Sequence, residues 1–154
     1  MSGITIRFGL RHEREALEEL QRRASLMWEE YRPYLLASPE AIELPLAQLR
    51  DGRVRVAQMA GRVAGFSALL PKDGFCELDG LFVEPQMWGR GVGRALIGDA
   101  LVQARAQGAA TLATVANPRA EGFYEKLGFT VSGRAQTQFG PANRMQISVF
   151  SAQT

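Results

Sequence analysis

Hydrophobic and polar residues alternate along the chain with two different periods, and these periods divide it into helices and strands. Between residues 12 and 31, apolar side chains recur three or four positions apart, which places them on one face of a helix. Short runs rich in β-branched and aromatic residues, bounded by glycine-containing turns, predict strands instead. The predicted strands cover residues 4–8, 54–59, 62–70, 75–83 and 110–116, and two further strands follow residue 128.

Turn and capping residues set the limits of the other helices. Ser38-Pro39 offers an N-cap and an N1 proline, which predicts a second helix from there to about Leu49. Glycine stops predict two more helices, over residues 91–106 and 118–127. The expected order of elements is therefore β-α-α-β-β-β-α-β-α-β-β.

Composition is that of an ordinary globular protein, and we expect a single domain over residues 1–154. The chain is 46% hydrophobic and 22% charged, and its net charge of +2 is too small to indicate a nucleic-acid partner. It has no apolar run of about 18 residues and no signal-like start, and its one cysteine cannot form an internal disulfide. We therefore expect a cytoplasmic protein with neither a nucleic-acid nor a membrane partner.

The segment between Val83 and Leu96 carries the most informative chemical signal. An apolar strand ends at Val83, and alternating glycines then lead into a helix that begins near Gly91. This layout directs backbone N–H groups and the positive end of the helix dipole at one point, which suits a phosphate. Glycine lets a bulky anion approach the backbone, and Arg90 and Arg94 add positive charge beside it.

Two common phosphate-binding loops do not fit the spacing of these glycines. A dinucleotide-binding G-x-G-x-x-G would need glycine in place of Arg94, or glycine or alanine in place of Leu96. The G-x-x-x-x-G-K-S/T loop of nucleoside triphosphatases has no counterpart anywhere in the sequence. The segment therefore belongs to neither class.

Residues 88–93, Trp-Gly-Arg-Gly-Val-Gly, resemble the pyrophosphate loop Q/R-x-x-G-x-G/A of the GNAT superfamily, the GCN5-related N-acetyltransferases. Trp88 departs from the family pattern, which has Gln or Arg at this position. Downstream, residues 117–129 are similar to the family's segment that starts with Asn and ends in Phe-Tyr-Glu-Lys-Leu-Gly-Phe. The two motifs in this order are typical of the family, and the resemblance covers roughly residues 4–150.

The resemblance implies a mixed α/β fold, the GNAT acyl-CoA N-acyltransferase fold. In that fold a mostly antiparallel sheet is flanked by helices and splayed between its fourth and fifth strands, here residues 75–83 and 110–116. The gap accepts the pantetheine arm of acetyl-CoA, with the pyrophosphate at the helix N-terminus. The family also implies direct transfer of the acetyl group from acetyl-CoA to a primary amine within a ternary complex, without a metal.

The donor site implied by the family combines the end of a strand, the glycine loop and residues further along the chain. Gly80 inside the strand suggests a bulge or a close approach, which would free an N–H for the oxyanion of the reaction. Asn117 precedes a helix, so it is an N-cap, a contact to the CoA arm, or both. The expected donor contacts are Leu81, Phe82, Val83, Trp88, Gly89, Arg90, Gly91, Val92, Gly93, Arg94, Asn117 and Tyr124.

Two carboxylates and one tyrosine are the candidates for proton transfer. A lysine-like ammonium has a pKa of about 10 and must lose a proton before it attacks. Glu77 and Asp79 lie on one strand face, and Glu77 matches the base of histone-acetylating members of the family. We expect Glu77 to act through a water; Asp79, or water chains without a dedicated base, are the alternatives. Tyr124 matches the family's tyrosine acid, and otherwise it is a core aromatic residue whose hydroxyl reaches the surface.

The acceptor side is less well defined by the sequence, which allows a small-molecule or a peptide amine. In the family the turn between the first two helices walls the acceptor pocket, so Trp28 and Tyr31 either touch the substrate or belong to the core. Residues 134–143 are expected to form the other wall, as the loop between the last two strands. Cys76 is expected to pack as a small hydrophobic residue.

Three functions follow from these observations. The first is an acetyl-CoA-dependent N-acetyltransferase, and the second is a non-catalytic acyl-CoA-binding module. The third is a family member that acylates a protein or uses a longer acyl-CoA. Glu77 and Tyr124 together argue against the non-catalytic module, and a homodimer is compatible with all three functions.

Overall fold

The computed structural model describes residues 3–150, which form two compact units. We call residues 3–68 and 80–96 the N-terminal unit, and residues 69–79 and 97–150 the C-terminal unit. The strands are β1 Ile4–Phe8, β2 Val54–Met59, β3 Arg62–Pro71, β4 Phe75–Val83, β5 Thr111–Ala116, β6 Thr130–Thr137 and β7 Gly140–Ser148. The α-helices are α1 Arg14–Leu26, α2 Arg32–Ala37, α3 Leu46–Arg50, α4 Val92–Ala106 and α5 Glu121–Lys126. Single 3₁₀ turns cover Arg11–Glu13, Pro39–Ala41, Pro85–Met87 and Pro118–Ala120.

Hydrogen-bonded strands follow the order β1-β2-β3-β4-β5-β7-β6. In the N-terminal unit, β1 pairs with β2 and β2 with β3, both antiparallel. In the C-terminal unit, β4 runs parallel to β5, and the pairing ends at Leu78 and Thr114. β7 lies between β5 and β6 and is antiparallel to both. The predicted mixed α/β fold, with a mostly antiparallel sheet that splays between its fourth and fifth strands, is confirmed.

Helix α1 buries the central part of its predicted apolar face in the N-terminal unit. Leu17 and Leu20 are 1% and 2% exposed, and they form one cluster with residues of β2 and β3 that includes Phe66. Burial of side chains of this size stabilises a fold by about 1.5–3 kcal/mol each. The prediction that the same face continues to residue 31 is wrong, because α1 ends at Leu26 and Met27 is exposed.

A second cluster of the N-terminal unit fixes the first turn of α4. Val92 and Leu96 are buried together with Ala57 and Ala64, and Leu81 and Val83 of β4 pack against them. The two ends of the glycine loop, β4 and α4, are therefore fixed on the same small core.

The predicted helix from Ser38 to Leu49 is wrong. The chain instead forms α2, a single 3₁₀ turn and the short α3, and Pro45 is the N-cap of α3. Proline inside a helix removes a hydrogen bond and clashes with the preceding turn, so Pro45 ends any helix that approaches it. Ser38 makes no side-chain cap, although Pro33 does occupy the first turn of α2 as expected of a helix start.

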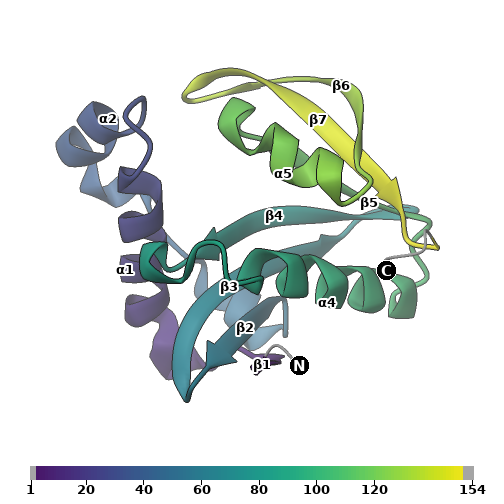
Figure 1. Cartoon of the computed structure of the whole chain (residues 1–154), viewed down its shortest axis with the longest axis horizontal. Coiled ribbons are helices and arrows are strands. Elements are labelled where there is room, and N and C mark those ends of the chain that lie inside the picture. The colour runs from purple at the N-terminus through teal and green to yellow at the C-terminus, as the bar shows by residue number, and fades with distance from the viewer. Residues whose placement is uncertain (1–2, 151–154) are drawn as a thin grey trace. The chain divides into compact units, whose positions relative to one another are not determined.

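In the C-terminal unit, α5 lies beside β7 (Figure 1), and the side-chain amide of Asn143 donates to both carboxylate oxygens of Glu121 at 3.2 and 3.3 Å. The prediction of a loop over residues 134–143 is wrong, because β6 and β7 form a hairpin in which only Gln138 and Phe139 lie between strands. Pro141 is tolerated in β7 because pairing with β5 covers only residues 143–148.

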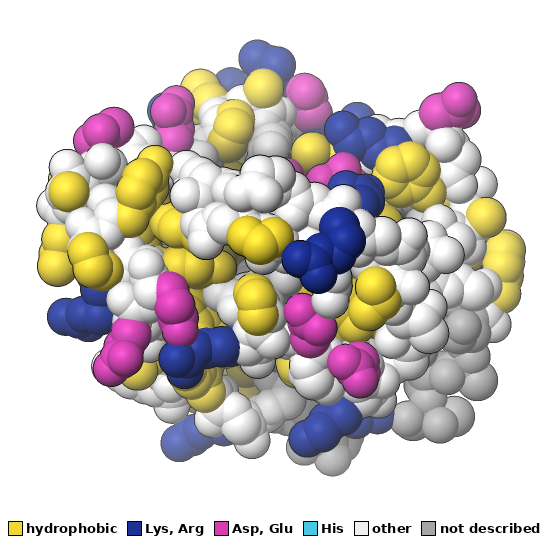
Figure 2. Space-filling model, turned by 90° about the horizontal axis from the view of Figure 1, so that it is seen from above, with side chains coloured by type: hydrophobic (Ala, Val, Ile, Leu, Met, Phe, Trp, Pro, Cys, Tyr) yellow, Lys and Arg dark blue, Asp and Glu magenta, His cyan; other side chains and the backbone are white. Residues whose placement is uncertain are grey.

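Among the helices of residues 3–150, none combines the length and apolar character needed to cross a bilayer. On the face shown in Figure 2, Lys and Arg side chains are interspersed with Asp and Glu. Charges of both signs therefore share that surface, in agreement with the small net charge of +2.

Candidate active site

The glycine loop of the N-terminal unit adopts backbone conformations that need glycine. Gly89 and Gly91 have φ angles of +80° and +85°, in the left-handed region. A Cβ built on either residue meets no other atom within 4 Å, so backbone strain and not crowding selects glycine here. These open surroundings agree with the predicted reason for the glycines, which is that a ligand can approach the backbone.

The start of α4 presents backbone donors in the same region. The first bond of the helix runs from Ala95 N–H to the Gly91 carbonyl at 3.0 Å, so the N–H groups of Gly91, Val92 and Gly93 precede the helical ladder. α4 is 15 residues long, and its dipole places partial positive charge at this end. The exposed side chains of Arg90 and Arg94 add formal charge. Together these groups suit a phosphate.

The end of β4 is held closely against β3. The Glu84 N–H donates to the Ala64 carbonyl at 2.8 Å, and a Cβ on Gly65 would lie 2.7 Å from the Phe82 carbonyl oxygen. Gly65 is therefore a position where only glycine lets the two backbones approach. At Gly80, a Cβ would meet the Phe82 ring at 2.7 Å, so this glycine makes room for a ring of its own strand. A bulge at Gly80 that frees an N–H stays a prediction.

Trp88 makes two contacts within the N-terminal unit. Its indole stacks on that of Trp28, with ring centroids 5.8 Å apart and an interplanar angle of 28°. Its Nε1–H donates to the Val83 carbonyl at 2.9 Å. One acceptor lone pair of Val83, a predicted contact of the CoA arm, is therefore already occupied.

Tyr124 is buried in the C-terminal unit. Its side chain is 6% exposed and packs edge-on against Phe123 and Phe129. Burial raises the pKa of Tyr124 to about 12, while a hydrogen bond with the Thr114 side chain acts in the opposite direction. The alternative that Tyr124 is a core aromatic residue is correct for its ring, but its hydroxyl meets Thr114 and not the surface.

Thr114 is a residue that the sequence analysis missed. It is 4% exposed, and its hydroxyl lies 3.1 Å from the Leu78 carbonyl, to which it donates. Leu78 and Thr114 are also the last pair of the β4–β5 ladder. The Tyr124 hydroxyl is therefore held at the point where these strands separate. The available signal was a polar residue between two apolar ones, Leu112 and Ala116, on the buried face of the strand.

A cavity of about 590 Å³ lies in the C-terminal unit beside the two predicted carboxylates. Glu77 and Asp79 line it from β4, as their shared strand face predicts. Its remaining lining residues are Leu78, Val115, Ala135, Gln136, Thr137, Gln138 and Arg144. Residues 135–138 of the segment predicted as a wall line this cavity, from a hairpin and not from a loop, and a contact with the acceptor stays a prediction. Arg144 is half-buried and was not predicted as a site residue.

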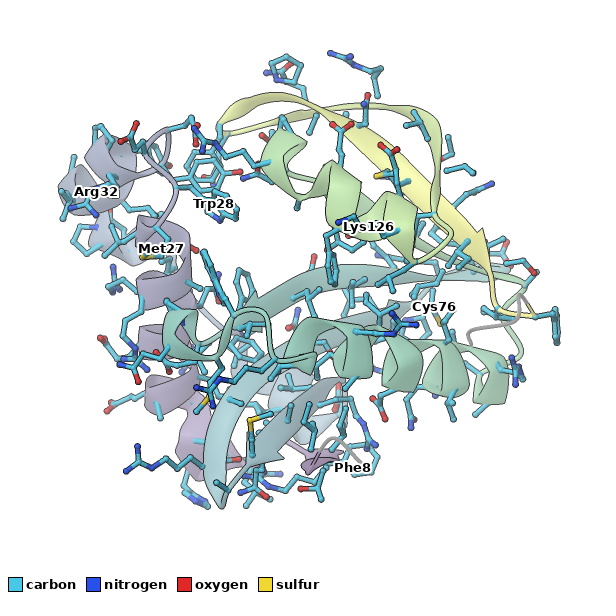
Figure 3. All side chains as sticks on the ribbon, viewed as in Figure 1. Phe8, Met27, Trp28, Arg32, Cys76 and Lys126 are labelled. Carbon is cyan, nitrogen blue, oxygen red and sulfur yellow. The ribbon has the colours of Figure 1, made fainter. Side chains whose placement is uncertain are left out.

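The remaining candidates fall in three places. Asn117 Oδ1 accepts from the Arg119 N–H at 2.8 Å, so the N-cap role is confirmed and the contact to CoA stays a prediction. Figure 3 shows Trp28 in the turn between α1 and α2, and Tyr31 is the N-cap residue of α2. Cys76 is fully buried, as expected of a small hydrophobic residue.

The structure therefore gathers the candidates into two groups. In the N-terminal unit it brings together the end of β4, the glycine loop, the first turn of α4 and Trp28. In the C-terminal unit it brings Glu77 and Asp79 to one cavity, and it joins Tyr124 to Thr114. Within residues 3–150, no cluster of three or more His, Cys, Asp or Glu side chains could hold a metal ion.

Residues 15–129 match the sequence model of the Acetyltransferase (GNAT) family. The chain belongs to this family. The family as a whole uses acetyl-CoA as the acetyl donor, which agrees with a loop suited to a pyrophosphate.

YjaB is one relative within the family. Over 59 residues the chain is 41% identical to the peptidyl-lysine N-acetyltransferase YjaB of Salmonella typhimurium, a match that covers 38% of this chain and 39% of YjaB. The aligned segment therefore spans about two fifths of that relative. The solution structure of apo YjaB from Escherichia coli aligns over 97% of this chain and 99% of YjaB, with a TM-score of 0.69 and 27% identity.

Two crystal structures share the fold over almost the whole chain. A GCN5-related N-acetyltransferase from Rhodopseudomonas palustris has a TM-score of 0.78 and 25% identity, covering 96% of this chain and 97% of that protein. The PaiA N-acetyltransferase of Thermoplasma acidophilum, solved in complex with coenzyme A, has a TM-score of 0.76 and 21% identity, covering 94% and 98%.

Proposed function

We propose that this protein transfers the acetyl group of acetyl-CoA to the side-chain amine of a lysine within a peptide or protein. The observation that carries the choice of acceptor is the cavity of about 590 Å³ in the C-terminal unit, where Glu77 and Asp79 share a wall. Two carboxylates on one wall favour an acceptor that arrives as a cation. The full-length structural likeness to YjaB, which is named a peptidyl-lysine N-acetyltransferase, supports a lysine as that cation.

Arg144 further restricts the class of acceptor that we propose. It lines the same cavity, is half-buried, and makes no ion pair with any of residues 3–150. A guanidinium in such a place suits a carboxylate on the ligand. We infer that a lysine with an acidic residue beside it is preferred, because the ammonium then meets Glu77 and Asp79 while the acid meets Arg144.

On the donor side, the backbone of the glycine loop and of the first turn of α4 would bind the pyrophosphate. The N–H groups of Gly91, Val92 and Gly93 would donate to it, with Gly89, Arg90 and Arg94 beside them and Asn117 as a contact to the arm. Leu81, Phe82 and Val83 would supply backbone groups to the pantetheine arm and the acetyl carbonyl. The carbonyl of Val83 would offer only its second lone pair, since the Trp88 indole uses the first.

The chemical step removes two protons from the lysine nitrogen, one before the attack and one after it. A water held by Glu77 takes a proton from the lysine ammonium, and the free amine attacks the acetyl carbonyl carbon. The tetrahedral oxyanion collapses, the C–S bond breaks, and an amide and CoA thiolate form. The amide nitrogen gives its remaining extra proton to water. Asp79 is the alternative base on the same wall, and a third possibility is that the amine binds already neutral.

Tyr124 has a role that its environment restricts. Its pKa of about 12 lies well above the pKa of about 8.5 of an ordinary thiol, so a phenol in this site keeps its proton beside a thiolate. Tyr124 therefore stabilises the leaving sulfur as a hydrogen-bond donor. For this its hydroxyl proton turns from Thr114, whose own proton goes to the Leu78 carbonyl, toward the sulfur. Bulk water protonates the thiolate after release. This is a narrower role than that of a general acid.

The acceptor class is tested by thiol release from acetyl-CoA with a matched set of acceptors. The set contains a lysine peptide with a blocked N-terminus and a neighbouring Asp, the same peptide with Asn, a peptide with a free N-terminus and no lysine, and a small diamine. We expect the highest kcat/KM for the Asp-containing lysine peptide, and Arg144→Gln should remove the advantage of Asp over Asn. Preference for the diamine or for the free N-terminus would replace the lysine assignment. Equal rates for propionyl-CoA and acetyl-CoA would favour a member with broader acyl use.

A further inference from the structure

Trp88 departs from the family pattern at the one position where the glycine loop normally carries Gln or Arg, and its contacts show what replaces that residue. Its indole is 42% exposed, stacks on Trp28 and donates to the Val83 carbonyl. The two stacked indoles are the only tryptophans in the sequence. The side chain therefore binds to the protein itself on two sides.

The segment that leads into the glycine loop also forms an ion pair with α1. Arg23 and Glu84 form a two-pronged ion pair, with Nε–Oε1 and Nη2–Oε2 distances of 2.7 and 2.8 Å. Planar pairing of this kind fixes direction as well as distance. Arg23 lies in the last turn of α1 and Trp28 follows the helix, so α1 and the turn after it contact both ends of residues 84–88.

Between its two fixed ends, the loop beyond Trp88 has one long backbone hydrogen bond, from the Arg90 N–H to the Met87 carbonyl at 3.3 Å. Gly89 and Gly91 adopt left-handed conformations, and no atom lies within 4 Å of where a Cβ would be. Glycine has the widest choice of backbone conformations in the unbound state, so a ligand that needs one conformation must order the loop. A contact that orders the loop beforehand reduces this cost and raises affinity.

We propose that Trp88 and Trp28 are positioning residues, and that their stack holds the glycine loop in its donor-binding conformation and links donor affinity to the turn between α1 and α2. At position 88, a contact that orders the loop replaces the side-chain contact with phosphate. Trp28 needs no contact with the donor to affect its binding. Because aromatic pairs are individually modest, we expect a change in CoA affinity of about three- to tenfold.

The inference rests on the proposed donor site, and its test is a double-mutant cycle on the CoA dissociation constant measured by calorimetry. Trp28→Ala and Trp88→Ala are each expected to weaken binding about three- to tenfold. The double variant should be no weaker than the worse single variant, because both singles break the same contact. Trp28→Phe keeps a stacking ring and should restore affinity to within about twofold of the natural protein. Leu46→Ala, which removes another exposed apolar side chain of the N-terminal unit, should leave the affinity unchanged.

A spectroscopic readout separates this inference from the proposed function. Since the chain has two tryptophans, near-UV circular dichroism of the apo protein reports on the stack directly, and the signal of the coupled indoles should vanish in either single variant. Thermal unfolding of each variant shows whether it is folded. Unchanged CoA affinity in folded Trp28→Ala, or losses that simply add in the double variant, would overturn the inference. Absence of CoA binding in the natural protein, with the indole signal intact, would instead overturn the proposed donor site.

Discussion

The two units of this molecule hold candidate groups of different kinds. In the N-terminal unit, the proposed donor site comes from one continuous segment, residues 80–94, and its candidate groups are mostly backbone N–H groups at a helix start. In the C-terminal unit, the candidate groups are side chains from four separate elements: Glu77 from β4, Thr114 from β5, Tyr124 from α5 and Arg144 from β7. The proposed donor contacts therefore depend on backbone conformation, and the proposed proton transfer and acceptor contacts depend on tertiary packing.

The largest expected effect is on the backbone site. Gly93→Glu places a carboxylate at the start of α4, where it would compete with the pyrophosphate for the same N–H groups. Loss of two charge-assisted hydrogen bonds, each worth about 1.5–3 kcal/mol, predicts CoA binding weaker by about 10²–10⁴-fold in calorimetry. Gly98→Glu in the same helix is the control, because a Cβ on Gly98 meets no atom within 4 Å and the variant adds the same charge away from the helix start. Equal CoA affinity in the two variants would remove the start of α4 from the donor site.

The second-largest expected effect is on kcat, with little change in CoA affinity. Tyr124→Phe removes one hydroxyl from a buried ring, so CoA affinity should change little while kcat on a lysine peptide falls about 10²–10³-fold, as for loss of one donor to a developing anion. A donor and an acid both need the protonated hydroxyl, so with a pKa of about 12 kcat of the natural enzyme should show no decline from this group below about pH 10. Full turnover in Tyr124→Phe would leave the hydroxyl a structural partner of Thr114 alone.

The two carboxylates of the cavity can be distinguished by their pH dependence. Glu77→Gln should flatten the acid limb of the pH–rate profile and lower turnover by about 10²-fold near neutral pH. The rate should partly recover at high pH, where the amine is already neutral. Asp79→Asn, two residues along the same strand face, is the comparison that decides between them. The opposite pattern would assign the base to Asp79, and two unaltered profiles would mean that no carboxylate serves as base.

The smallest effect is on stability at high pH. Burial raises the pKa of Tyr124 to about 12, from about 10 for an exposed tyrosine. As the pH rises between these values, the unfolded chain loses this proton while the folded protein keeps it, so the free energy of unfolding falls. A shift of this size corresponds to about 2–3 kcal/mol, lost progressively between about pH 10 and pH 12. Denaturant unfolding at about pH 9 and pH 11.5 should show this loss in the natural protein and a smaller one in Tyr124→Phe. Identical losses would show that Tyr124 titrates as an exposed tyrosine does.

The same contrast explains what the sequence could predict. The strand ending at Val83 and the order of elements from β2 to β7 depend on neighbours along the chain, and these predictions were confirmed. Before β2 the predicted order is wrong, because three α-helices stand where two were expected. The contact of Tyr124 with Thr114 joins two elements only after α5 packs in the C-terminal unit, so no local pattern contains it. A loop over residues 134–143 is the local prediction because Gly140-Pro141 is typical of turns, whereas the hairpin places that pair at the start of β7. Arg144 lies just outside that range, and no local pattern marks it as a site residue.

The errors in the first helices have a similar cause. Ser38-Pro39 is a good local start signal, and the prediction gave it more weight than Pro45. The apolar stripe of α1 was extended to Tyr31, but Trp28 stacks on a residue 60 positions away in the sequence, and local periodicity cannot show this contact. Tertiary contacts of this kind override a local pattern.

The most direct test of the proposed activity is mass spectrometry of a lysine peptide with a blocked N-terminus after incubation with acetyl-CoA and the purified protein. We predict one added acetyl group on the lysine side chain, in equal amount to the free CoA thiol released, and none with Gly93→Glu. A protein that binds acetyl-CoA in calorimetry but leaves this peptide and every small amine unmodified, with no thiol released, would contradict the proposed activity.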